Sequence, residues 1–287
     1  MRAERWEAPS DLRQAGVVAY YELYKYFQSY RILGMFVLSA LVIALILIVP
    51  PALGQEYPRE PAFYAQRYLL WVSVLTVVGA TLFAGDALAS EFQNRTAYLM
   101  FPNPVKRWAY FAGKLAASVI TLAVVITVYY VVVSILTIFQ TDGFSDLTFQ
   151  SYGISLMYVV AAVGVGYLVS SIMKGSTEAL VFTLAILLLV FPIIDGVLAV
   201  AGVKPTFSVT FNAMAIGDVM QDPYPQDQLF TFPVGGGFFG GGGGGLETFS
   251  VWDYHPDLEL VPVVMAAYAV VTIAMALVLF RRREMAA

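Results

Sequence analysis

The chain has 287 residues, of which 59% are hydrophobic and only 13% charged, and its mean hydropathy is +0.74. Soluble domains carry about a quarter charged residues, so this composition excludes an ordinary water-soluble protein and favours a membrane protein. Cysteine is absent and His255 is the single histidine. This excludes disulfides and thiolate metal sites and argues against a classical zinc site, so we expect no metal in this chain.

The residues before the first apolar run predict an amphipathic helix. Val17, Tyr20, Tyr24 and Phe27 recur at helical spacing in the sequence VVAYYELYKYFQSYRIL. Tyrosine favours the headgroup layer, and amphipathic helices lie at that surface. Residues 1–31 are therefore expected to form a cytoplasmic N-terminus with an interfacial helix. The alternative is that the first span begins early.

Six long, nearly uncharged apolar runs follow. A helix that rises 1.5 Å per residue needs about 20 residues to cross about 30 Å of hydrocarbon. The sequence therefore predicts an all-α membrane protein with six transmembrane helices. The runs cover residues 32–53, 68–83, 115–139, 154–173, 179–201 and 260–280. We accordingly divide the chain into the N-terminal residues 1–31, spans one to five in 32–201, a Gly-rich extracellular loop in 202–258, and the last span with the C-terminus in 259–287.

The basic residues predict the orientation of the spans, because Lys and Arg near span ends are retained in the cytoplasm. With both termini inside, thirteen of the 16 basic residues are cytoplasmic, and only Arg59, Arg67 and Lys204 lie outside. The outer segments are rich in acidic residues and should repel anions. We expect a multi-pass protein of the cell membrane with cytoplasmic termini, in contact with lipid and not with nucleic acid.

Small residues mark the second and fourth spans. Gly79 and Gly85 lie in the second, and Gly164 and Gly166 lie in the fourth. Small residues let helix backbones approach closely in lipid. They indicate either close packing within the chain or an interface between subunits, and the pattern does not separate the two.

The outer loop carries two features. Its run FPVGGGFFGGGGGG is not followed by Lys-Ser or Lys-Thr and lies outside, so a flexible loop is favoured over a phosphate-binding loop. Before it, TFSVTFNAMAIGDVM predicts a short helix that rests on the outer surface through Phe207, Phe211, Met214 and Ile216. A lid over the bundle and a cap that binds a partner both fit this pattern.

Three carboxylates near the spans are candidate functional residues, because burying charge in hydrocarbon is costly. Asp195 follows Pro192 and lies 17 residues after Glu178, about 25 Å up a helix, which indicates a position at the outer mouth. Asp86 lies at the inner end of the second span, and we expect both Asp86 and Glu178 to reach water. Ser176 or Thr177 is predicted to cap the fifth span.

Between the second and third spans lies the polar stretch ASEFQNRTAYLMFPNPVKRWAYFAGK. Residues 87–100 are predicted to continue as a helix into the cytoplasm, with Glu91 and Arg95 four residues apart as a favourable pair. Pro102 and Pro104 then end it, and the chain returns to the membrane. This indicates a helix, a sharp turn and a second helix, with a polar surface toward the cytosol.

This stretch resembles the segment between the second and third spans of type 2 ABC exporter permeases. The family pattern has a Glu, a Thr, a leucine-like run, a Pro, an Arg and a downstream Lys. These places are taken here by Glu91, Thr96, Leu99, Pro104, Arg107 and Lys114. The family commonly has a glycine before the threonine, where this chain has Arg95. The six-span layout and the N-terminal helix extend the resemblance over most of the chain.

The resemblance implies a permease subunit without a nucleotide site of its own. ATP and Mg²⁺ would be held by separate cytosolic ABC ATPase subunits, and a second permease copy or homologue would complete the unit. The stretch after the second span would be a coupling helix in a groove of the ATPase, with the turn SSIMKGSTE as a second contact. The implied coupling residues are Glu91, Arg95, Thr96, Pro104, Lys106 and Arg107, with Lys174 and Glu178 in the second contact.

Two other classes of function remain open from the sequence. A non-transporting subunit could anchor or regulate an outer partner through residues 203–257. An intramembrane enzyme could use Asp86 or Asp195, but no second acid, histidine or amine stands at a spacing typical of acid-base catalysis.

Overall fold

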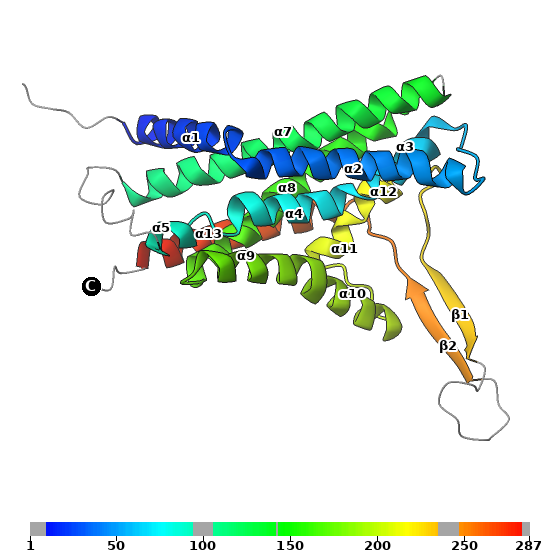
Figure 1. Cartoon of the computed structure of the whole chain (residues 1–287). Helices are drawn as coiled ribbons and strands as arrows, with labels where there is room; N and C mark the ends of the chain where they lie inside the picture. Colours follow the sequence, from blue (N-terminus) through cyan, green and yellow to red (C-terminus); the bar gives the residue numbers. More distant parts are fainter. Residues whose placement is uncertain (1–9, 94–105, 142, 235–246, 283–287) are drawn as a thin grey trace, which may run out of the picture.

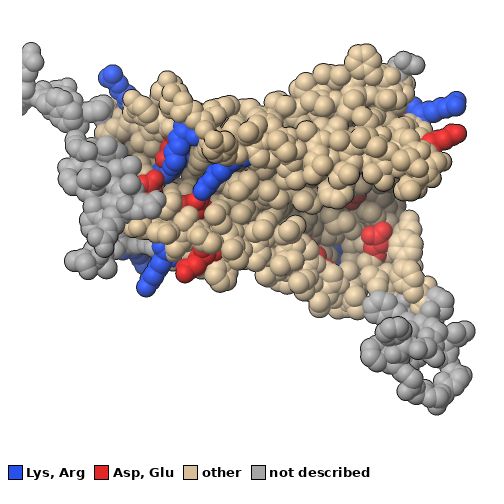
Figure 2. All heavy atoms as spheres, viewed as in Figure 1, with Lys and Arg blue, Asp and Glu red and all other residues tan. Residues whose placement is uncertain are grey.

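The computed structural model describes residues 10–93, 106–141, 143–234 and 247–282. Within them lie six helical segments long and apolar enough to cross a membrane, which confirms the predicted number of spans. They are α2 (Tyr30–Ala52), the segment Pro61–Gln93, α7 (Arg107–Thr141), α8 (Leu147–Ile172), the segment Ser176–Val200 and α13 (Val261–Arg282). In Figure 1 they run side by side. On the face shown in Figure 2, charged side chains gather toward the two ends of the bundle, as expected if its middle lies in hydrocarbon.

We name the ends of the bundle by what they carry. The α1 end holds α1 (Asp11–Phe27), α5 (Ala89–Gln93), and the last residues of α13. The hairpin end holds the antiparallel strands β1 (Gln228–Val234) and β2 (Glu247–Asp253), which project sideways from the bundle in Figure 1. The hairpin lies within the segment for which the sequence predicts a long outer loop. The glycine run itself falls outside the described residues.

The N-terminal helix is separate from the first span, so the alternative of an early start to that span is wrong. α1 ends at Phe27, and the Ser29 hydroxyl donates to the carbonyl of Tyr26 where the chain turns into α2. α1 packs along α7 with Gln14, Glu22 and Tyr26 buried. Its aromatic face points away from the protein, with Tyr20 65% exposed. This is the reverse of a soluble amphipathic helix and fits contact with lipid headgroups.

The second span is broken twice. It consists of α3 (Pro61–Leu69), α4 (Val72–Ala84) and α5, and it begins earlier than the predicted residue 68. The expectation that a helix continues without interruption from residue 87 is wrong, because residues 85–88 form a turn. The backbone N–H groups of Leu88 and Ala89 donate to Oγ of Ser170 in α8 at 2.9 and 3.0 Å. A serine on a neighbouring helix thus satisfies donors that the break leaves free.

α8 lies at the centre of the bundle and packs against α4, α7, α9 (Ser176–Ala185) and α13. In the most apolar stretch of α8, 67% of the residues are buried, against 11% for the fifth span. A Cβ added to Gly166 would lie 2.9 Å from Cβ of Ala84, and one added to Gly164 would lie 2.4 Å from Oγ1 of Thr272. These glycines therefore serve close helix packing within the chain.

Two short helices, α11 (Val209–Ala213) and α12 (Ala215–Asp218), pack into the hairpin end against α3, α8 and α13. The single short helix that the sequence predicts is divided in two, and of its four apolar residues Phe211 and Ile216 are buried, whereas Phe207 and Met214 are exposed. The carbonyl of Ile216 accepts a hydrogen bond from Ser151 at 2.6 Å, which ties the segment to α8.

The fifth span is continuous but changes its helical period. α9 leads into a π-helical turn, η1 (Ile186–Val190), and then into α10 (Phe191–Val200). Pro192 has no backbone N–H to donate to the preceding turn, and a π turn is a common way for a helix to accommodate such a loss. The turn lies where the span has few buried residues.

We predict that Gly166→Leu destabilises the bundle and that Gly153→Leu does not. Both glycines lie in α8, but a Cβ on Gly153 would meet nothing within 4 Å. Forcing a side chain into a packed seam costs about 1–3 kcal/mol. The measurement is the thermal unfolding midpoint in detergent, and equal midpoints for the two variants would contradict this account of the α4–α8 seam.

Candidate functional site

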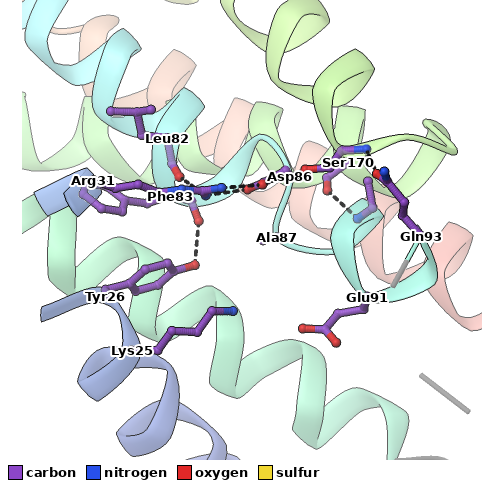
Figure 3. Close-up of polar contacts among 12 residues, drawn as sticks. Lys25, Tyr26, Arg31, Leu82, Phe83, Asp86, Ala87, Glu91, Gln93 and Ser170 are labelled. Atoms are coloured by element: carbon purple, nitrogen blue, oxygen red, sulfur yellow. Dashed lines mark hydrogen bonds and ion pairs between the residues drawn. The ribbon is translucent and has the colours of Figure 1, made fainter. Parts of the chain in front are cut away.

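A buried polar cluster lies at the α1 end, where α1, the turn 85–88, α5, α7 and the start of α9 meet. We call it the α1-end cluster and define it by the residues that carry its polar contacts: Glu22, Tyr26, Arg31, Asp86, Glu91, Gln93, Lys114, Ser118, Ser170 and Ser176. Several of these residues also line a cavity of ≈ 350 Å³. Figure 3 shows many of these side chains, with Lys25, Tyr26, Asp86 and Glu91 around a common space.

Lys114 is the centre of the cluster. Its side chain is 1% exposed, and its ammonium lies 2.7 Å from a carboxylate oxygen of Glu22 in α1 and 2.8 Å from one of Glu91 in α5. The ammonium also donates to the carbonyl of Ala87 at 3.2 Å. All three N–H donors of the lysine thus have an acceptor on a different segment. The charge is tolerated inside the protein because it is paired and hydrogen-bonded.

Arg31 and Asp86 form the second ion pair. The guanidinium of Arg31 donates to both oxygens of the Asp86 carboxylate at 2.8 Å, and also to the carbonyl of Leu82 at 2.7 Å. A bidentate pair of this kind fixes geometry as well as charge. The expectation that Asp86 reaches water is wrong for this structure, because Asp86 is only 5% exposed.

Ser176, the first residue of α9, contacts both Asp86 of this ion pair and Gln93 of α5. The hydroxyl of Ser176 donates to Asp86 at 2.8 Å, and the backbone N–H of Ser176 donates to Oε1 of Gln93 at 2.6 Å. The prediction that Ser176 or Thr177 caps the fifth span is therefore wrong. The N-cap is Gly175, and no side chain caps it. Ser176 instead connects the fifth span to the end of α5.

The hydroxyl groups of Tyr26, Ser118 and Tyr167 form hydrogen bonds next to the ion pairs. The carbonyl of Phe83 accepts hydrogen bonds from Tyr26 and Ser118, both at 2.8 Å, and Ser118 lies 3.0 Å from the hydroxyl of Tyr167. Burial raises the pKa of the Tyr26 hydroxyl, so it keeps its proton and remains a donor. The carbonyl of Phe83 lies at the end of α4, so these hydrogen bonds stabilise the break in the helix that follows it.

The structure places the sequence-predicted coupling residues in different environments. Glu91 is buried against Lys114, whereas Lys174 and Glu178 are exposed. Lys106 pairs with Asp11 at 2.8 Å, and its backbone N–H donates to Gln14. Arg95, Thr96 and Pro104 lie outside the described residues, as does the predicted Glu91–Arg95 pair.

Arg107 ties the beginning of α7 to the end of α13, because its guanidinium donates to the carbonyl of Arg281 at 3.0 Å. On the other side of residues 94–105, Gln93 accepts from Ser176, and Glu91 pairs with Lys114. The described residues that flank this segment therefore contact α1, α7, α9 and α13. The two stretches predicted to be separate contacts, after the second span and in the turn before the fifth, lie next to each other.

Sequence reasoning did not single out Glu22, Arg31, Lys114 and Ser170 as one site. The available signals were a lysine within an otherwise uncharged run after Tyr110 and an acidic residue in an aromatic helix. The two carboxylates Asp86 and Asp195, which the sequence marks as candidates, lie at opposite ends of the bundle. Asp86 belongs to the α1-end cluster, whereas Asp195 lies at the hairpin end and accepts hydrogen bonds from Ser208 and Thr210. Among the described residues, no three acidic or histidine side chains are grouped to hold a metal ion.

Comparison with known families identifies the chain. Residues 17–285 match the family model described as ABC-2 family transporter protein. The chain belongs to this family. A search among curated proteins returned no match. The resemblance seen in the polar stretch after the second span is thus confirmed, and the match covers both the α1-end cluster and the hairpin end.

Family membership makes the chain a component of a membrane transporter and a transport subunit that is not itself catalytic. In the cluster, Asp86 pairs with Arg31, and the ammonium of Lys114 is held by two carboxylates and a carbonyl.

We predict that Lys114→Met destabilises the protein strongly, because it removes the ammonium that pairs with the buried carboxylate of Glu91 and leaves Glu22 only its longer pair with Lys25 at 3.5 Å. Breaking a buried pair costs about 3–5 kcal/mol. The matched control is Lys106→Met, whose pair with Asp11 is 60% and 33% exposed and should be worth at most about 1 kcal/mol. The triple variant Glu22→Gln/Glu91→Gln/Lys114→Met should recover much of the loss in thermal midpoint. A triple variant as unstable as Lys114→Met would show that packing, and not charge, dominates.

Proposed function

We propose that this chain is the membrane-spanning subunit of an ATP-driven ABC exporter. In this proposal the α1 end is cytoplasmic, both termini lie inside, and cytosolic ABC ATPase subunits bind there. ATP and Mg²⁺ belong to those subunits, and this chain holds no cofactor. Two permease copies or homologues form the pathway and move an unidentified substrate by alternating access.

The observation that carries the proposal is the set of contacts on both sides of residues 94–105. Glu91 is joined through Lys114 to α1, Gln93 to α9, Lys106 to α1, and Arg107 to α13. A force applied to this segment by an ATPase would act at once on α1 and on the third, fifth and sixth spans. Of these contacts, the ion pairs of Lys114 are buried and multiply hydrogen-bonded, so they resist local displacement and would transmit the force.

The proposed ATPase contact therefore divides into two groups of residues. Arg95, Thr96, Pro104, Lys174 and Glu178 would meet the ATPase. Glu91, Lys106 and Arg107 would pass the displacement on to the bundle. The distribution of basic residues supports the cytoplasmic assignment of the α1 end. Arg31, Lys106, Arg107 and Arg281 make contacts there, and Lys174 lies two residues before Ser176 at the start of α9.

We predict that Arg107→Glu reduces stimulation of ATP hydrolysis by this chain at least about tenfold, because it removes one charge-assisted hydrogen bond to α13 and reverses the charge at the contact. The assay is copurification of the tagged chain with its ABC ATPase, followed by ATPase activity in nanodiscs. The control is Arg59→Glu, the same charge reversal at an exposed position of the hairpin end.

Glu91→Lys is the second coupling variant and should act in the same direction through Lys114. If Arg107→Glu and Glu91→Lys both bind and stimulate the ATPase as well as the unaltered chain does, the coupling proposal fails. If the chain copurifies with no ATPase at all, the permease proposal itself fails.

One observation favours a second candidate function, the anchoring of an outer partner. The hairpin presents Leu229, Phe230 and Phe232, which are 46–54% exposed, and the rings of Phe230 and Phe232 stack at 6.5 Å. Exposed apolar patches often mark interaction sites. Deletion of residues 235–246 distinguishes the two functions: loss of a partner with intact ATPase stimulation would favour anchoring.

A further inference from the structure

A second cavity lies at the hairpin end, between α10, the α11 region and the end of β2. Its volume is ≈ 330 Å³. Its lining is mostly proline, alanine and aromatic side chains, together with the two carboxylates Asp195 and Asp253. Among the described residues no lysine or arginine lines it. A cavity of this size and composition is suited to a small ligand with one polar group.

Asp195 supplies an unused acceptor at this cavity. Its Oδ2 atom accepts hydrogen bonds from Ser208 at 3.0 Å and from Thr210 at 2.7 Å. Its Oδ1 atom is buried and has no hydrogen-bond donor among the described residues. A buried acceptor without a partner costs free energy, and such a group in a native fold calls for a partner from outside the chain. This atom has almost no accessible surface, so a donor in the cavity reaches it after a small shift of the side chains that cover it.

The end of β2 brings two aromatic rings to the cavity beside the second carboxylate. The rings of Trp252 and Tyr254 stack with their centroids 5.4 Å apart and their planes 3° apart, and Asp253 lies between them in the chain. Trp252 lies against Gly202, where an added Cβ would be 3.6 Å from the indole nitrogen. Aromatic faces attract cations. Two carboxylates and two aromatic rings in one lining favour a positive charge in the cavity and disfavour an anion.

We propose that this cavity binds a primary ammonium group carried on a small apolar body. The ammonium donates one N–H to Oδ1 of Asp195 and lies in the field of Asp253, while the apolar body contacts Trp252 and Tyr254. Two sources share this chemistry: the headgroup of an aminophospholipid at the membrane surface, and a free amphipathic amine. The proposal does not depend on which ATPase drives the transporter.

The test uses 2-phenylethylammonium as probe and the full chain in phosphatidylcholine nanodiscs, with calorimetry as the measurement. Asp195→Asn should weaken binding at least about tenfold, because the ammonium then meets a neutral amide in place of a carboxylate and the charge-assisted part of the hydrogen bond is lost. Asp222→Asn, which removes an exposed carboxylate of the same end outside the cavity, should leave binding unchanged. The neutral analogue 2-phenylethanol should bind at least about tenfold more weakly than the probe.

A second variant keeps the test decisive if Asp195→Asn folds poorly. Gly196 lines the cavity, and a Cβ there meets nothing within 4 Å beyond its chain neighbours, so Gly196→Phe can add bulk at the cavity and keep the carboxylate of Asp195. It should abolish binding of the probe. Wild-type affinity in Gly196→Phe, or equal affinity of the ammonium and the alcohol, would overturn the proposal.

Phosphatidylethanolamine in the nanodisc separates the two sources. If the lipid headgroup is the ligand, this lipid should compete with the probe. It should then lower the apparent affinity of the probe by the same factor for the unaltered chain and for Asp222→Asn. If the free amine is the ligand, the probe should bind equally well with and without the lipid. Failure of the probe to bind under either condition would overturn the proposal and would leave ATPase coupling at the α1 end untouched.

Discussion

The arrangement of the α1 end depends on one side chain, the buried lysine of α7. An ammonium inside an apolar bundle is tolerated only if its donors are satisfied. Lys114 meets this condition with Glu22, Glu91 and the carbonyl of Ala87. Because Glu22 must face inward, α1 is turned so that Tyr20, Tyr21 and Tyr24 face outward. The lysine thus sets both the position of α1 and the lipid-facing character of its outer side.

The broken second span follows from the same requirement. A continuous helix would satisfy its own backbone, whereas the turn at 85–88 leaves donors that other helices must accept. Ser170 accepts two of them, and the freed carbonyl of Ala87 is used by Lys114. The break also directs the carboxylate of Asp86 toward Arg31 and Ser176. Backbone donors, carboxylates and cations at this end therefore form a single network, and removal of one member leaves another unpaired.

The number of spans and the position of the amphipathic helix could be predicted because both depend on local patterns of hydrophobicity. The ion pairs of the α1 end could not be predicted in this way. Glu22 and Lys114 are 92 residues apart, and helical periodicity describes only neighbours within a turn or two. The same limit explains Phe211 and Ile216: an apolar stripe predicts that a helix will be covered on one side, but not whether protein or lipid covers it. Ser176 shows a third case, in which a residue suited to a cap makes a distant contact instead.

The fifth span connects the two sites at opposite ends of the bundle. At the α1 end Ser176 joins it to Asp86 and Gln93, and at the hairpin end Asp195 joins it to Ser208 and Thr210. Between these polar contacts the span is the least buried of the six and contains the π-helical turn. A helix with few packing contacts along its length loses little when it shifts, whereas α8 would have to break a close-packed core. Of the spans, this one therefore offers the least costly route by which a displacement at Gln93 reaches the cavity beside Asp195.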